Sequence, residues 1–151
     1  MIHVVLFQPE IPQNTGNIAR TCAITGAKLH LIRPLGFSVD ERSVRRAGLD
    51  YWDKVEVEVH DNLEQFCEKY PVDIYLVTTH GEMIYTEVDY EADCAVLFGS
   101  ESRGVPDEIH QCFAGRRIKI PMRNRAGNRS LNLSNSAAIL IYEIWRQRSF
   151  Q

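Results

Sequence analysis

The chain has 151 residues, 44% of them hydrophobic and 25% charged, with a formal net charge of −3 at pH 7. This length and composition suit one globular domain with one core. No apolar run approaches the roughly 20 residues that a membrane helix needs, and the N-terminus lacks the basic region and cleavage site of a signal peptide. We therefore expect a single domain over residues 1–151 and no membrane partner.

The cysteines and histidines give no sign of a metal or redox centre. Cys22, Cys67, Cys94 and Cys112 are widely spaced and form no C-x-x-C pair. Cys22 and Cys94 lie in apolar segments and should be buried thiols. The five histidines show no metal-ligand spacing. We expect a reduced, cytoplasmic protein without a bound metal.

Charge is distributed unevenly along the chain. From Gly115 onward there are eight basic residues and one acidic residue, Glu143, whereas the rest carries nine basic and nineteen acidic residues. Such an asymmetry can mark an anionic partner. A solvated basic face balanced by the acidic half explains the same counts equally well.

Hydrophobic patterning in chain order predicts strands that alternate with helices. The predicted strands cover 2–7, 28–32, 55–59, 73–79, 94–99 and 117–121. The first predicted helix follows the cap Asn14 and stops at Gly26. The other predicted helices cover 40–48, 62–70, 106–113 and 134–147. This alternation predicts an α/β fold with a mostly parallel sheet. Ligands of such sheets bind beyond the carboxyl ends of the strands.

The segment FGSESRGVP, residues 98–106, lies at one of those strand ends. Gly99 and Gly104 permit unusual backbone conformations and close approach of a ligand, and Glu101 and Arg103 lie between them. The Gly-Lys-Ser/Thr ending of a phosphate loop is missing, and no Gly-x-Gly pattern follows the first strand. A plain turn would rarely be this long or this charged. The segment therefore favours a nucleotide-like pocket away from the usual dinucleotide position.

The stretch RNRAGNRSLNLSNSAAILIYEIW, residues 123–145, is polar in its first half and apolar in its second. Asn132, Ser134 and Asn135 can cap the last helix, but one or two caps suffice. The excess amides and hydroxyls predict that another polar group binds here. The arginines of the stretch could meet phosphates or belong to a surface loop. The helix itself is apolar around most of its circumference, so it must be buried in its own core or against a second subunit. Its place at a chain end slightly favours an obligate dimer interface over core packing.

A resemblance to the SPOUT superfamily of RNA methyltransferases is carried by the stretches PEIPQNTGNIARTCAITGAKLHLI, PLGF, RRAGLDYW, LFGSESRGVP and IPM…RSLNLSNSAAILIYEIWR. It covers essentially the whole chain, and the motifs occur in the expected order. The resemblance implies an α/β fold with a deep C-terminal trefoil knot, a homodimer, and S-adenosylmethionine (AdoMet) bound in the knot loops. It also implies 2′-O-methylation of the ribose at wobble position 34, a cytidine or modified uridine, in leucine tRNAs.

Matched position by position, the resemblance implies roles for individual residues. Arg20 and Asn135 would be catalytic. Because arginine stays protonated, with a pKa above ~12, Arg20 would stabilise the developing alkoxide or pair with an RNA phosphate. Cofactor binding would involve Val77, Thr78, Thr79, Gly99, Glu101, Gly104, Ile120, Met122, Ser130, Leu131 and Leu133. Separately from this matching, the arginines on the predicted helix at 40–48 and near the expected knot are candidate contacts to tRNA phosphates: Arg42, Arg45, Arg46 and Arg129, with Arg116 and Arg117 as further candidates.

Two other functions remain open on the sequence. One is a related 2′-O-methyltransferase acting on rRNA or on another tRNA position, and the small size without an added RNA-binding domain favours the wobble reaction over it. The other is a non-catalytic AdoMet- or RNA-binding module, against which the joint presence of Arg20, Glu101, Ser130 and Asn135 argues. The loop of residues 123–128 is slightly longer than the resemblance leads one to expect and has no assigned role.

Overall fold

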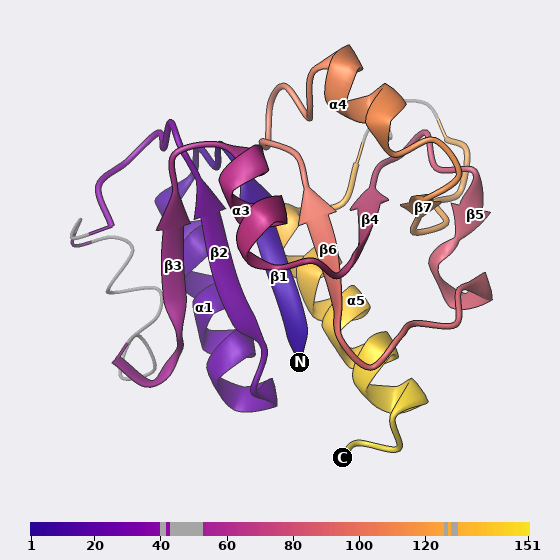
Figure 1. Cartoon of the computed structure of the whole chain (residues 1–151). Coiled ribbons are helices and arrows are strands. Elements are labelled where there is room, and N and C mark those ends of the chain that lie inside the picture. Colours follow the sequence, from indigo (N-terminus) through magenta and orange to yellow (C-terminus); the bar gives the residue numbers. More distant parts are fainter. Residues whose placement is uncertain (40–41, 43–52, 126, 128–129) are drawn as a thin grey trace.

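The computed structural model describes residues 1–39, 42, 53–125, 127 and 130–151. Its sheet has the strand order β3-β2-β1-β6-β4-β7-β5, and every pairing in it is parallel (Figure 1). The α/β fold with a mostly parallel sheet is thereby confirmed. The strands are β1 (Ile2–Phe7), β2 (Lys28–Ile32), β3 (Val57–His60), β4 (Asp73–Val77), β5 (Met83–Ile84), β6 (Cys94–Phe98) and β7 (Arg117–Lys119).

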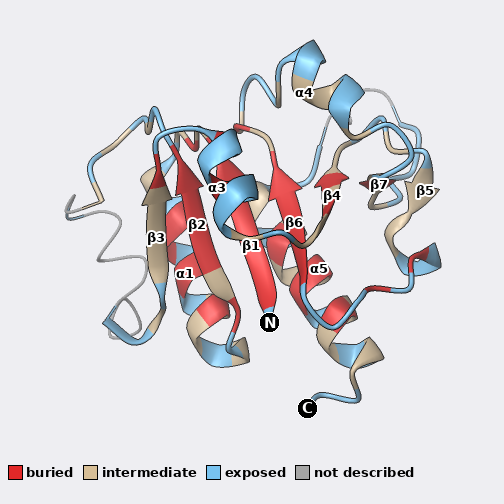
Figure 2. Ribbon diagram, viewed as in Figure 1, coloured by how far each residue is buried: buried red, intermediate tan, exposed pale blue. Residues whose placement is uncertain are grey.

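Helices cover both faces of the sheet (Figure 1). On one face lie α1 (Pro12–Thr25) and α5 (Leu133–Gln147), and on the other lie α3 (Leu63–Lys69) and α4 (Asp107–Cys112). All residues of β1 and β6 are buried, as Figure 2 shows for the centre of the sheet. Double-sided burial explains why these two strands are continuous apolar runs in the sequence.

The first helix begins earlier than its predicted cap. It starts at Pro12 with Ile11 as its N-cap, whereas Asn14 lies inside the first turn. Proline favours the first helical position because its fixed φ suits the helix and the missing N–H is not needed there. The Asn14 side chain is used elsewhere, since its Oδ1 accepts a hydrogen bond of 3.1 Å from Asn132 Nδ2. The predicted end at Gly26 is confirmed, with a left-handed φ of 79°.

One strand prediction was displaced, three were too long, and two elements were missed. The strand predicted at 55–59 is β3, which starts at Val57 because its ladder with β2 begins at the pair Leu29 and Val57. The strands predicted as far as residues 79, 99 and 121 end at Val77, Phe98 and Lys119. The two-residue β5 and the short 3-10 helix Tyr85–Glu87 were not predicted, because segments this short carry no measurable periodicity. The helix predicted at 40–48 lies outside the described residues, apart from Arg42.

The last helix is buried largely in the core of its own chain. It packs against α1, β1 and β6, and its buried residues are Ala137, Leu140, Ile141 and Ile144. Tyr142 remains 43% exposed. Core packing therefore accounts for one face of this helix, and a second subunit would have only the remaining side to cover.

The trefoil knot stays a prediction. A knot is a property of the whole backbone path, which here passes through residues 126, 128 and 129, outside the described residues. The parallel pairing of β7 with β4, next to β6, is consistent with such a path.

The described helices include none that combines the length and the apolar character needed to cross a bilayer. All four cysteines are free thiols. Cys22 and Cys94 are buried as predicted, and burial raises the pKa of Cys22 to about 12.

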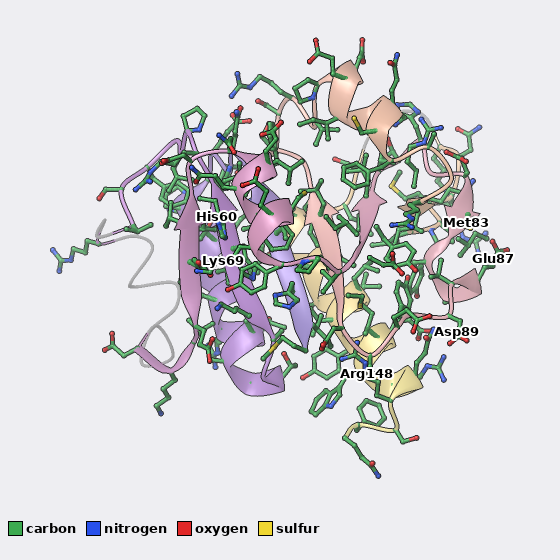
Figure 3. All side chains as sticks on the ribbon, viewed as in Figure 1. His60, Lys69, Met83, Glu87, Asp89 and Arg148 are labelled. Carbon is green, nitrogen blue, oxygen red and sulfur yellow. The ribbon has the colours of Figure 1, made fainter. Side chains whose placement is uncertain are left out.

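A chain of three buried histidines lies under α3, on strands β1, β2 and β3. His3 Nδ1 is 2.9 Å from His30 Nε2, and His30 Nδ1 is 3.0 Å from His60 Nε2. Figure 3 shows His60 and Lys69 on this side of the sheet. Each ring contact uses one N–H and one lone pair, so three neutral imidazoles satisfy one another. Burial lowers the pKa of all three, that of His30 to about 3.

Glu58 closes this network at its outer edge. Its Oε2 lies 3.9 Å from His30 Nδ1 and accepts a hydrogen bond of 2.5 Å from the Tyr70 hydroxyl. Lys28 and Lys69 form ion pairs with the same carboxylate. His30, His60 and Glu58 place possible metal-ligand atoms within 4.8 Å of one another. Because the ring nitrogens pair with each other and two lysines already neutralise the carboxylate, we assign a structural role to the network.

The histidine chain should make the fold sensitive to acid. The folded-state pKa of His30 lies below the unfolded value of about 6.5, so stability is fully present above that pH and falls as the pH drops toward 3. We expect His30 to cost about 2 kcal/mol of unfolding free energy between pH 7.5 and pH 5. Urea unfolding at the two pH values measures this loss.

His30→Gln should flatten that pH dependence, whereas His80→Gln, at an exposed position, should leave it unchanged. Equal wild-type stability at both pH values would contradict the prediction. The comparison stops at pH 5 because the carboxylates begin to protonate below it.

Candidate active site

A cavity of about 430 Å³ opens at the carboxyl ends of β4 and β6. Its walls come from the end of β4, the loop between β6 and α4, the segment after β7 and the start of α5. The volume falls within the range of about 300–1,000 Å³ that is common for ligand sites. All of the residues predicted to bind the cofactor line it: Val77, Thr78, Thr79, Gly99, Glu101, Gly104, Ile120, Met122, Ser130, Leu131 and Leu133.

The lining divides into an apolar part and a polar part. Leu76 and Phe98, both almost fully buried, provide apolar surface where the strands end. Ser100, Asn132 and Ser136 add hydroxyl and amide groups from the loops and from α5. Such a lining fits a ligand with a flat apolar ring and a polar tail. Within the described part of the chain, the cavity has eight further lining residues that were not predicted to bind the cofactor: Ile11, Asn14, Leu76, Phe98, Ser100, Val105, Asn132 and Ser136.

The loop between β6 and α4 is closed on itself by two backbone hydrogen bonds. Ser100 N donates to Gly104 O at 3.1 Å, and Gly104 N donates to Ser100 O at 2.8 Å. Gly104 has a φ of +65°, in the left-handed region that favours glycine. A Cβ on Gly99 would lie 2.5 Å from the carbonyl carbon of Gly104. Both glycines are therefore needed for this wall of the cavity.

Asn132 connects the start of α5 with α1. Its Oδ1 accepts hydrogen bonds from the backbone N–H groups of Ser134 at 2.9 Å and Asn135 at 3.3 Å, which caps the helix as predicted. Its Nδ2 donates to Asn14. One asparagine thus orders the polar stretch that precedes α5, and Asn14, Asn132 and Ser136 come together on the cavity wall.

The two residues predicted to be catalytic lie outside the cavity lining. Asn135 is exposed in the first turn of α5. Arg20 is exposed on α1, six residues beyond Asn14 and so about 9 Å further along the helix axis.

The predicted phosphate contacts are only partly placed. Arg42 is exposed, whereas Arg45, Arg46 and Arg129 lie outside the described residues. Arg116 forms an ion pair with Asp73 at 2.9 Å, and Arg117 pairs with Glu82. Their contacts to tRNA stay predictions.

Comparison with known proteins identifies the family. The profile of the SpoU rRNA Methylase family matches residues 1–142. A tRNA (cytidine(34)-2′-O)-methyltransferase of Aeromonas hydrophila is 47% identical over 152 residues, covering 99% of this chain and 96% of that protein. The chain belongs to the SpoU methylase family.

Solved structures agree with this assignment. One, described as giving insights into the methylation of C/U34 on tRNA, has a TM-score of 0.94 at 43% identity and covers 100% of this chain and 98% of that chain. An AdoMet-bound rRNA methyltransferase from Sinorhizobium meliloti has a TM-score of 0.83 at 26% identity, covering 96% of this chain and 56% of that one. SpoU methylases use AdoMet, so the predicted superfamily, enzyme class and cofactor are confirmed.

Replacing Gly99 should damage the cavity in which we expect AdoMet to bind. In Gly99→Ala the new methyl group would force the backbone of Gly104 to move, because the two would otherwise be 2.5 Å apart. We expect AdoMet affinity to fall about tenfold or more, since a displaced wall no longer holds the ligand. Isothermal titration calorimetry with AdoMet measures this.

Gly115→Ala is the matched control. Gly115 also has a positive φ, +85°, but a Cβ added there would meet nothing within 4 Å, and the residue does not line the cavity. The variant should lose some stability and keep its AdoMet affinity. Equal affinities for wild type and Gly99→Ala would show that this wall does not contact the cofactor.

Proposed function

We propose that this protein transfers the methyl group of AdoMet to the ribose 2′-oxygen of nucleotide 34 in tRNA, and that its substrates are leucine tRNAs with cytidine or a modified uridine at that position. The proposal rests above all on one observation: the residues matched to the family's cofactor site line a single cavity. It is supported by the 47% identity to a tRNA (cytidine(34)-2′-O)-methyltransferase, which extends over 99% of this chain. A cytoplasmic location, where tRNA is found, follows from the proposal.

The residues of the cavity have separable tasks in this reaction. When bound, AdoMet supplies a methyl group activated on a sulfonium centre. Leu76, Phe98 and Leu133 offer the apolar surface for its adenine, and Ser130 and Asn132 offer polar groups for its amino-acid end. Holding the two reactants in line is the main contribution that a protein can make to such a transfer.

We also propose that the enzyme acts as a homodimer. Exposed apolar side chains lie on or beside α1 and α5, among them Ile24 and Tyr142, and at the cavity rim, where Ile11, Met122 and Leu131 are exposed. Arg20 is exposed and outside the cavity lining of its own chain, so a second subunit offers it a route to a neighbouring cavity. Light scattering coupled to size-exclusion chromatography tests the association.

Arg20 is proposed to stabilise the charge that develops on the ribose oxygen. Arg20→Ala should lower kcat about 100-fold or more, in line with the loss of one electrostatic stabiliser, and should leave the Kd for AdoMet nearly unchanged. Arg20→Lys keeps the charge and should retain part of the activity. Single-turnover methylation measures the first effect and calorimetry the second. Full turnover by Arg20→Ala would overturn this role.

The substrate is tested by incubating the protein with labelled AdoMet and total tRNA from a strain that lacks the activity, followed by nucleoside mapping. We expect label at the 2′-oxygen of residue 34 in leucine tRNAs. Because the family's description names rRNA, rRNA is the second candidate, and label found only there would replace the first. Tight AdoMet binding without label on any RNA would instead indicate a binding module.

A further inference from the structure

Two glutamates in separate loops each accept hydrogen bonds from residues of the other's loop. The Glu101 carboxylate, in the loop after β6, accepts hydrogen bonds from Glu10 N at 3.1 and 3.2 Å and from Ile11 N at 2.5 Å. In return, the Glu10 carboxylate accepts hydrogen bonds from Ser102 N at 3.1 Å and from Ser102 Oγ at 2.7 and 2.8 Å. The turn before α1 and the cavity loop are thus joined from both sides.

The sequence around α1 explains why this exchange is needed. The N-cap of α1 is Ile11, whose side chain cannot cap, and the first turn contains no acidic residue. The positive end of the helix dipole therefore has no acidic partner within the first turn of the helix. The Glu101 carboxylate provides the missing negative charge from a loop 90 residues away in sequence.

The turn before α1 is itself anchored to the end of the neighbouring strand β2 and to the segment that follows it. Gln8 N donates to Ile32 O, the end of β2, at 3.0 Å, and Gly36 N donates to Pro9 O at 2.9 Å. Asn14, in the first turn of α1, is held by Asn132 at the start of α5. Because the turn has these fixed points, the Glu10 carboxylate can position the loop at Ser102.

The held loop is one wall of the cavity, which Gly99, Ser100, Glu101 and Gly104 line. Neither Glu10 nor Ser102 lines it. We propose that Glu10 is a positioning residue for the methyl transfer: through Ser102 it holds the loop of residues 99–104 in the conformation that receives AdoMet. The role of Glu10 in methyl transfer rests on the proposed function. Its effect on AdoMet binding does not depend on the RNA substrate and can be measured without RNA.

The hydrogen bonds of Ser102 also hold the pKa of the Glu10 carboxyl below its usual range, so Glu10 is charged at neutral pH. The guanidinium of Arg103, with its Nε 4.0 Å from Glu10 Oε1, adds to this. A charged acceptor makes the stronger hydrogen bond. Position 10 therefore needs an ionised side chain of this length.

The test is calorimetric titration with AdoMet alone on a set of variants. Glu10→Ala should raise the Kd for AdoMet about tenfold, the effect of losing hydrogen bonds to a charged group. Glu10→Gln keeps one acceptor oxygen and should recover part of the affinity. Ser102→Ala should weaken binding less than Glu10→Ala, and the double variant Glu10→Ala with Ser102→Ala should be no worse than Glu10→Ala, because both act through one contact. Glu108→Ala, an exposed position on α4, is the control and should bind as wild type does.

Steady-state kinetics separates positioning from a general loss of stability. Glu10→Ala should raise the KM for AdoMet while the KM for tRNA stays unchanged, and urea unfolding shows that the variant is folded at the assay temperature. An unchanged Kd for AdoMet in folded Glu10→Ala, or additive effects of the two substitutions, would overturn the proposal. If the wild-type protein binds AdoMet but methylates no tRNA, the proposed substrate is wrong. The titrations with AdoMet would still test the role of Glu10.

Discussion

The fold depends on the burial of a parallel sheet on both faces. Strands β1 and β6 are buried along their entire length, and both pair in parallel register, β1 with β2 and β6 with β4. Parallel strands bring all their carboxyl ends to one edge, so the turns that leave β1, β4 and β6 must meet there. The cavity lies at that edge, where loops rather than helices form most of its walls. The parallel arrangement of the buried strands therefore determines where the site lies.

At this edge the chain uses polar side chains to hold loops together. Glu10, Glu101 and Ser102 join the first turn to the loop after β6, and Asn14 joins Asn132 at the start of α5. These contacts span about 90 and 118 residues of sequence. Glu101 replaces a cap that the segment before α1 does not supply, and Asn132 caps α5 while it holds α1. The same hydrogen bonds thus stabilise helix ends and shape a ligand site.

The histidine chain on the α3 side of the sheet has a different character. His3, His30 and His60 form a row in which each ring is bonded to the next. Neutral rings paired in this way satisfy one another, and burial opposes their protonation. This cluster stabilises the sheet while its imidazoles are neutral. The polar groups at the cavity, by contrast, offer hydrogen bonds to an incoming ligand.

The sequence alone determined the local elements and the residue types of the site. Apolar runs identified β1, β4 and β6, Gly26 marked the end of α1, and the motif resemblance selected eleven of the residues that line the cavity. Only the tertiary structure decided which partners these residues have. The displacement of β3 came from its register with β2. The pairing of Glu10 with Ser102, and the three-strand histidine chain, depend on which strands become neighbours. Periodicity and spacing report on residues a few positions apart, so contacts between residues 27 to 118 positions apart were beyond them.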